Sequence, residues 1–324
     1  MADMFHIRAP SNLPSLVKSA FSKAKASGDL TYYPTRVALL ELSSIPFQLR
    51  FSPSLASKPK APKPKEPGAK PFNPFENPLP SMTVSELPPS HALVLNKFAI
   101  VPEHFILITK SAKPQTHVLE QDDIAATYAC IKAYRDNGKE LFAFFNSGPH
   151  SGASQPHRHL QLLPVDEMRA GLEDIKGEPQ WGILAEEVQR RTSDLPFAVL
   201  TETIAPEMAP EELHRKYLSL YRRAVNLVLP NSDAPAEGEA KISYNMAMTS
   251  TTLAVCPRRA EGASIQSKTG DDAGFVALNG TLLAGTALVK NESEWDALRE
   301  SPEKLLGVLN QIGIPSHDTI NGNL

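Results

Sequence analysis

The sequence contains very little cysteine and no excess of charge of either sign. Only Cys130 and Cys256 occur in 324 residues, which excludes a disulfide framework and a cysteine-rich zinc site and indicates a reducing compartment. Lys and Arg number 33 against 36 Asp and Glu, so no overall field favours nucleic acid or an anionic membrane. No apolar run approaches the roughly 20 residues of a membrane span, and the first residues lack the apolar core of a signal peptide. We therefore expect a cytoplasmic protein, with the nucleus as second choice.

Apolar residues recur with the periods of helices and strands along most of the chain. Helices are predicted at 13–24, ended by Gly28, at 121–138, at 211–229 and at about 291–311. Strands are predicted at VALLEL, FQLRF, HALVL, HFILITK, ELFAFFNSG, PHRHLQLLP and SYNMAMTSTTLAVCPRR, and GFVALNGTLLAGTALVK reads as a closing strand pair. This order predicts an α+β fold in which helices pack on an antiparallel sheet.

Residues 57–80, SKPKAPKPKEPGAKPFNPFENPLP, stand apart in composition. Eight prolines and five lysines in this stretch prevent a helix or a central strand. We interpret it as an extended surface connector, and the alternative is a basic loop that folds over an anionic ligand.

The second half of the sequence repeats the order of the first in altered form. An aromatic residue and Asn, a gap, an apolar strand and Pro occur in FFNSG…HRHLQLLP and again in SYNMAMTSTTLAVCP. The repeat places Thr252, Ala254 and Cys256 where the first copy has its polar residues. We predict an internally duplicated chain with a catalytic half at 1–192 and a degenerate half at 193–324.

Residues 151–164, SGASQPHRHLQLLP, carry a polar row inside an apolar strand. His157, His159 and Gln161 alternate with other residues, so in an extended chain all three project to one face. A neutral imidazole is a nucleophile toward phosphorus when its other ring nitrogen is held by an acceptor. Gln161 offers an amide donor to a phosphate oxygen but cannot take a proton from water, which favours group transfer over hydrolysis.

The loop NSGPHSGAS precedes this row and is rich in Gly and Ser. Its backbone N–H groups and hydroxyls could surround phosphates, which suits a protein without a strong net charge. The same spacing of histidines allows two other interpretations, a metal site and a pair of hydrogen-bonded core histidines. The metal interpretation has no third ligand beyond His150, His104 and scattered carboxylates. Neither alternative accounts for the loop and Gln161 together.

The motif HRHLQ preceded by SGAS resembles the transferase branch of the histidine triad superfamily. The segments NPFENPLPSMTVSELPPSHALVLNKFAIVPEHFILITK, FFNSGPHSGASQPHRHLQLLP, SYNMAMTSTTLAVCPRR and NGTLLAGTALVK resemble, in order, the diadenosine tetraphosphate phosphorylases, also called ATP adenylyltransferases. The resemblance implies a histidine-triad-like fold of the galactose-1-phosphate uridylyltransferase type, internally duplicated. It also implies phosphorolysis of diadenosine tetraphosphate to ATP and ADP, reversible as adenylyl transfer, through a nucleotidyl group on His159.

The resemblance further implies roles for individual residues. His157 would orient His159, and Gln161 would contact the transferred phosphoryl group. Residues expected to bind the substrate are Asn146, Ser147, Gly152, Ala153, Ser154, Gln155, Asn96 and Lys97. Lys97 could equally be a surface lysine, and we expect His104 to be structural.

The partners implied are a dinucleoside polyphosphate, ATP, ADP and inorganic phosphate, with neither nucleic acid nor membrane. No protein-bound cofactor or metal is expected, although the polyphosphate would bring Mg²⁺ with it. Two alternatives are a nucleotidyltransferase like the hexose-1-phosphate uridylyltransferases, which share the row but would add metal-ligand clusters, and a non-catalytic nucleotide-binding module. The sequence does not indicate an oligomeric state.

Overall fold

A large antiparallel sheet forms the centre of the protein. The computed structural model describes residues 7–43, 45–54, 72–172, 180–190 and 195–316. Eight strands pair in the order β10-β12-β11-β8-β9-β7-β5-β4, and all neighbours in this order are antiparallel. Their bounds are β4 (Thr83–Leu87), β5 (His91–Leu95), β7 (Phe105–Thr109), β8 (Leu141–Ser147), β9 (His159–Pro164), β10 (Leu200–Thr203), β11 (Ser243–Met248) and β12 (Thr252–Arg258).

Three smaller sheets accompany the large one. In the first of them β15 is parallel to β3 and β2 is antiparallel to it. The other two are a hairpin and a short parallel pair. Their strands are β2 (Arg36–Leu42), β3 (Ile45–Phe51), β15 (Thr286–Val289), β13 (Gly262–Gln266), β14 (Asp272–Ala277), β1 (Thr31–Tyr32) and β6 (Phe98–Ala99).

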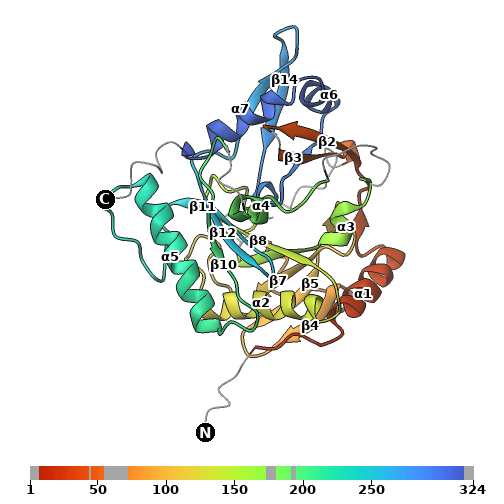
Figure 1. Ribbon diagram of the computed structural model, residues 1–324. Helices are drawn as coiled ribbons and strands as arrows, with labels where there is room; N and C mark the ends of the chain where they lie inside the picture. The colour runs from red at the N-terminus through yellow and green to blue at the C-terminus, as the bar shows by residue number, and fades with distance from the viewer. Residues whose placement is uncertain (1–6, 44, 55–71, 173–179, 191–194, 317–324) are drawn as a thin grey trace, which may run out of the picture.

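Helices cover both faces of the large sheet (Figure 1). One face packs against α1, α2 and α5, and the other carries the smaller β2-β3-β15 sheet with α6 and α7 beyond it. The helices are α1 (Leu13–Ser27), α2 (Gln121–Arg135), α3 (Val165–Arg169), α4 (Leu184–Arg190), α5 (Pro210–Val228), α6 (Glu292–Glu300) and α7 (Glu303–Ile312), with short 3₁₀ turns η2 (Pro80–Met82) and η3 (Gly280–Ala284). The predicted α+β architecture is confirmed.

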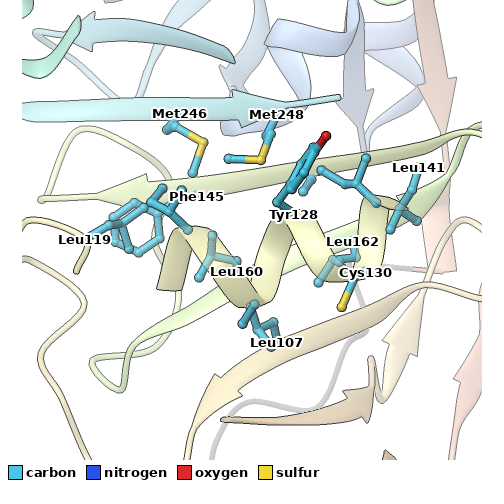
Figure 2. Packing of buried hydrophobic residues seen from close by; sticks show 14 of the residues in the cluster. Leu107, Leu119, Tyr128, Cys130, Leu141, Phe145, Leu160, Leu162, Met246 and Met248 are labelled. Carbon is cyan, nitrogen blue, oxygen red and sulfur yellow. The ribbon is translucent and has the colours of Figure 1, made fainter. Parts of the chain in front are cut away.

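Two apolar clusters, one on each face, hold these layers together. Strand residues alternate between them: Phe145 of β8 faces the cluster under α2 and α5, whereas Phe144 faces the cluster under the smaller sheet. Figure 2 shows the first cluster, in which Tyr128 and Cys130 of α2 lie among side chains from the strands. Within the described residues no helix is long and apolar enough to span a membrane.

The two halves of the chain meet at the centre of the sheet. β8 and β11 pair antiparallel, and Asn146 lies opposite Asn245. Each of these strands then pairs with the strand that follows it, β8 with β9 and β11 with β12. This arrangement agrees with an internal repeat. The predicted boundary at residue 192 lies outside the described residues and stays a prediction.

The register of the repeat differs from the one read in the sequence. Counted from the paired asparagines, the positions of His157, His159 and Gln161 correspond to Ala254, Cys256 and Arg258. The sequence pattern predicts Thr252, Ala254 and Cys256, so the predicted triplet begins two residues too early. The two prolines are not equivalent, because Pro164 lies opposite Leu141 at the start of β8 whereas Pro257 lies opposite Tyr244, next to Asn245.

Two predicted elements at the end of the chain are wrong. The single helix at 291–311 is two helices, α6 and α7, because Pro302 lacks an N–H donor and interrupts the first. The closing strand pair is not formed: β14 pairs with β13, and β15 pairs with β3. The turn η3 separates β14 from β15 and sends them to different sheets.

Candidate active site

The polar row lies at the start of β9, on the face opposite α2 and α5. His157 makes an isolated bridge to Pro114, and the continuous strand begins at His159. The rings of both histidines lie against Phe75, with centroid distances of 5.8 Å to His157 and 5.0 Å to His159. Gln161 lines a cavity on this same face. The three residues share a face as the alternation predicts, but only Gln161 is among the residues that line the cavity.

His159 has one ring nitrogen held and one available. Its Nδ1 donates to the backbone oxygen of His157 at 2.8 Å, which fixes the tautomer and leaves Nε2 with its lone pair. The residue is 2% exposed. Burial lowers the pKa of His159 to about 4; the bond to the His157 carbonyl raises it, and the nearby His157 ring lowers it. The imidazole is consequently neutral near pH 7, as a nucleophile must be.

The ring nitrogens of His157 are hydrogen-bonded to Thr109 and Asn73, and not to the ring of His159. Nε2 of His157 donates to the backbone oxygen of Thr109 at 2.7 Å, and its Nδ1 accepts from Nδ2 of Asn73 at 2.9 Å. His157 therefore contacts His159 through its backbone carbonyl, while its side chain ties β9 to the end of β7 and to the segment before η2.

The orientation of Gln161 is set by a hydrogen-bond relay. Nε2 of His104 donates to Oε1 of Gln161 at 2.6 Å, and Nδ2 of Asn96 lies 3.2 Å from Nδ1 of His104. Since Oε1 is used in this way, the Nε2 donors of Gln161 are left to face the cavity. Asn96 and His104 thus act together on Gln161, and no local pattern predicts this link because the three residues come from separate segments.

Phe75 and Asn73 complete the surroundings of the histidines. They follow the residues of the predicted connector that lie outside the described residues, and Phe75 is buried in a small cluster with Ile106 and Ile108. The interpretation of 57–80 as a surface connector is wrong for this part. The motif NPF at 73–75 could have indicated that this part is buried, because an amide and an aromatic side chain follow the lysine-rich stretch.

The glycine- and serine-rich loop closes one side of the cavity. Asn146, Gly152 and Ser154 line it, and Gly152 has a φ of +79°. A Cβ on Gly152 would lie 2.7 Å from Cβ of Asn279, so glycine is required for this close approach. Oδ1 of Asn146 accepts from Nδ2 of Asn245 and from the N–H of Gly280, each at 2.9 Å.

Other predicted site residues lie elsewhere. Ser147 is fully buried on the opposite face of β8, because neighbouring strand residues alternate. Ala153 and Gln155 belong to the loop but not to the cavity lining, and Lys97 is exposed with its ammonium group 6.0 Å from the ring centroid of Phe98. For these four residues the structure offers no side-chain contact with the cavity.

The cavity has a volume of about 310 Å³ and lies between the large sheet and the β2-β3-β15 sheet. Its described lining includes two cations, Arg50 and Lys290, and one carboxylate, Glu261. Sequence reasoning missed both cations, since neither lies near the polar row in the chain. Among the described residues no group of His, Cys, Asp and Glu is arranged to hold a metal ion.

Comparisons with known proteins identify relatives over nearly the whole chain. The family model "Ap4A phosphorylase N-terminal domain" matches residues 4–175, and "ATP adenylyltransferase C-terminal domain" matches residues 193–315. Diadenosine 5',5'''-P1,P4-tetraphosphate phosphorylase 2 of Saccharomyces cerevisiae is 29% identical over 322 residues, covering 94% of this chain and 95% of that protein. Protein APA1 of the same yeast is 28% identical over 320 residues, covering 95% and 96%.

Solved structures of a yeast relative match as well. The crystal structure of yeast Ap4A phosphorylase Apa2 superposes with a TM-score of 0.73 at 26% identity, covering 94% of this chain and 95% of that one. The structure of Apa2 in complex with Ap4A gives a TM-score of 0.72 at 25% identity, covering 94% and 98%.

Proposed function

We propose that this chain, which belongs to the diadenosine tetraphosphate phosphorylase and ATP adenylyltransferase family, converts diadenosine tetraphosphate and inorganic phosphate to ATP and ADP. The family resemblance read from the sequence is confirmed, and with it the class of enzyme, a nucleotidyltransferase. The observation that carries the specific proposal is the geometry of His159: a buried, neutral ring whose Nδ1 is held and whose Nε2 is available.

In the first step, Nε2 of His159 would attack the α-phosphorus of the dinucleotide. A nitrogen–phosphorus bond forms, the bond from that phosphorus to its bridging oxygen breaks, and ATP leaves. The hydrogen bond from Nδ1 to the carbonyl of His157 supports the positive charge that develops on the ring. An adenylyl group is then bonded to His159.

In the second step, an oxygen of inorganic phosphate would attack the same phosphorus. The nitrogen–phosphorus bond breaks, ADP leaves, and His159 returns to its neutral form. Gln161 supports this step because its amide donors can hold the phosphoryl oxygens without activating a water molecule. Phe75, packed against His159, would limit access of water to the adduct.

The cavity suits a polyanion. Arg50 and Lys290 supply positive charge to the cavity lining, and Asn146, Gly152 and Ser154 supply polar groups. We propose that the substrate's phosphates lie along this lining, and that any Mg²⁺ arrives with the polyphosphate and is not held by a dedicated protein site. The cytoplasmic location stays a prediction.

Product analysis tests the proposal. Purified protein with diadenosine tetraphosphate and phosphate should release ATP and ADP in equal amounts, and omitting phosphate should stop turnover. Release of ATP with AMP in the absence of phosphate would indicate a hydrolase and contradict the proposal. Turnover only with a UDP-hexose would favour the uridylyltransferase alternative, and binding without any product would favour a non-catalytic module.

A further inference from the structure

The two halves of the large sheet differ at one pair of positions. In the second half, β11 and β12 stay paired through Asn245 and Cys256. In the first half the corresponding residues are Asn146 and His159, but the pairing of β8 with β9 stops earlier, at Phe144 and Gln161. The strands of the catalytic half therefore separate where the reactive histidine stands.

The side-chain amide of Gln115 lies between the separated strands. Its Oε1 accepts from the N–H of His159 at 2.8 Å. Its Nε2 donates to the backbone oxygen of Asn146 at 2.8 Å and to the backbone oxygen of His159 at 3.1 Å. Three backbone groups that would otherwise lack partners are thus satisfied by one side chain, which is 2% exposed.

Gln115 is itself fixed to the segment that precedes β9. Its backbone N–H donates to the oxygen of Pro156 at 2.8 Å, and its neighbour Pro114 forms the bridge to His157. The segment that carries Gln115 is therefore bonded directly to the residues that lead into β9.

We propose that Gln115 is a positioning residue for nucleotidyl transfer: its amide keeps β8 and β9 apart and sets the place of His159 relative to the cavity. The proposal rests on the proposed function, because it assigns Gln115 a part in the reaction of His159. Asn146 and His159 thus occupy facing positions on β8 and β9 without the ladder pairing that joins Asn245 and Cys256. Cys256, in the half without such an amide, is fully buried in an unbroken ladder.

The position of Gln115 requires a side chain that both donates and accepts hydrogen bonds. Methionine has a similar length but would leave the three backbone groups unpaired. Glutamate would keep the acceptor for His159 and place a second oxygen against two carbonyl oxygens, so its carboxyl pKa would rise. Once protonated, that carboxyl could donate one of the two lost hydrogen bonds.

The test compares Gln115→Met and Gln115→Glu by single-turnover adenylylation and by steady-state kinetics. Both variants should lose about 100-fold in kcat at pH 8 with little change in KM, because misplacing a reacting atom by about 1 Å costs that much. Gln115→Glu should recover part of the loss as the pH falls through the raised pKa of the new carboxyl, and Gln115→Met should not.

Two controls separate positioning from general damage. Gln311→Met alters an exposed glutamine whose Nε2 donates to the backbone oxygen of Gly307 in its own helix, and it should leave kcat unchanged. Leu298→Ala removes buried side-chain volume from α6, away from the row, and should lower the urea midpoint while keeping kcat. If Gln115→Met loses kcat only as much as Leu298→Ala does, or if Gln115→Glu shows no recovery at low pH, the inference is wrong. An inactive unmodified protein would instead refute the proposed function.

Discussion

Nδ1 of His159 donates to the backbone oxygen of His157 at 2.8 Å, so the group that orients the reactive ring belongs to the main chain. A substitution of His157 that keeps the backbone in place keeps this acceptor. His157→Ala should therefore still form the adenylyl adduct, although the lost bond to Thr109 should reduce the free energy of unfolding by about 1–3 kcal/mol. Urea unfolding and intact-mass measurement check the two parts. An adduct abolished in a folded His157→Ala protein would show that the side chain itself takes part.

Phe75 packs against the ring of His159 and contributes to its burial. Its ring lies 5.0 Å from the imidazole, and burial lowers the pKa of His159 to about 4. Phe75→Ala should admit water and raise that pKa toward its ordinary value of about 6.5, so the ring becomes protonated as the pH falls below that value. Between pH 7.5 and 5.5 the adenylylation rate of the variant should fall about tenfold relative to the unmodified protein.

Phe72→Ala is the matched control for this prediction, because Phe72 precedes the same segment but is 61% exposed. Its pH profile should coincide with that of the unmodified protein. Identical profiles for all three proteins would mean that Phe75 does not determine the pKa of His159.

His104 fixes the amide of Gln161. Without its donor to Oε1, Gln161 can rotate and present oxygen in place of nitrogen to the phosphoryl group. His104→Leu should lower the transfer rate about tenfold, the effect of one hydrogen bond. Stopped-flow measurement of ATP release checks this, with His117→Leu as the control, since Nε2 of His117 lies 3.4 Å from Oε2 of Glu239 and His117 does not line the cavity. Equal rates for the two variants would show that His104 does not orient Gln161 for the transfer.

Asn245 supports the phosphate loop from the second half of the chain. Its Nδ2 donates to Asn146 and to the backbone oxygen of Ser151, and its Oδ1 accepts from Arg258. Asn245→Ala would leave buried polar groups unpaired and should reduce the free energy of unfolding by about 1–3 kcal/mol for each group orphaned. Asn226→Ala, on the exposed side of α5, should cost far less in the same urea titration.

Much of the fold followed from periodicity. The helix α1 ends at Gly28, which adopts φ of +80°, and α2 and α5 match the predicted ranges closely because their apolar faces are regular. Pairing was harder to predict. The pairing of β15 with β3 joins residues more than 230 positions apart. No local sequence pattern predicts such a contact.

In the candidate site, too, local relations were predictable and long-range contacts were not. Alternation placed His157, His159 and Gln161 on one face, because a strand fixes that relation within five residues. Alternation could equally have excluded Ser147 from the cavity, since Asn146 beside it faces the other way. Gln115 was beyond reach, because its role arises only where two strands separate around it.

Intact mass spectrometry shows whether His159 carries the nucleotidyl group. The protein is incubated with diadenosine tetraphosphate without phosphate, quenched at alkaline pH to preserve the nitrogen–phosphorus bond, and weighed intact, with the adduct then located by peptide mapping. We expect one added adenylyl group on His159, which phosphate removes as ADP and which is absent from His159→Ala. An adduct on another residue, or turnover to ATP and ADP by His159→Ala, would contradict this assignment.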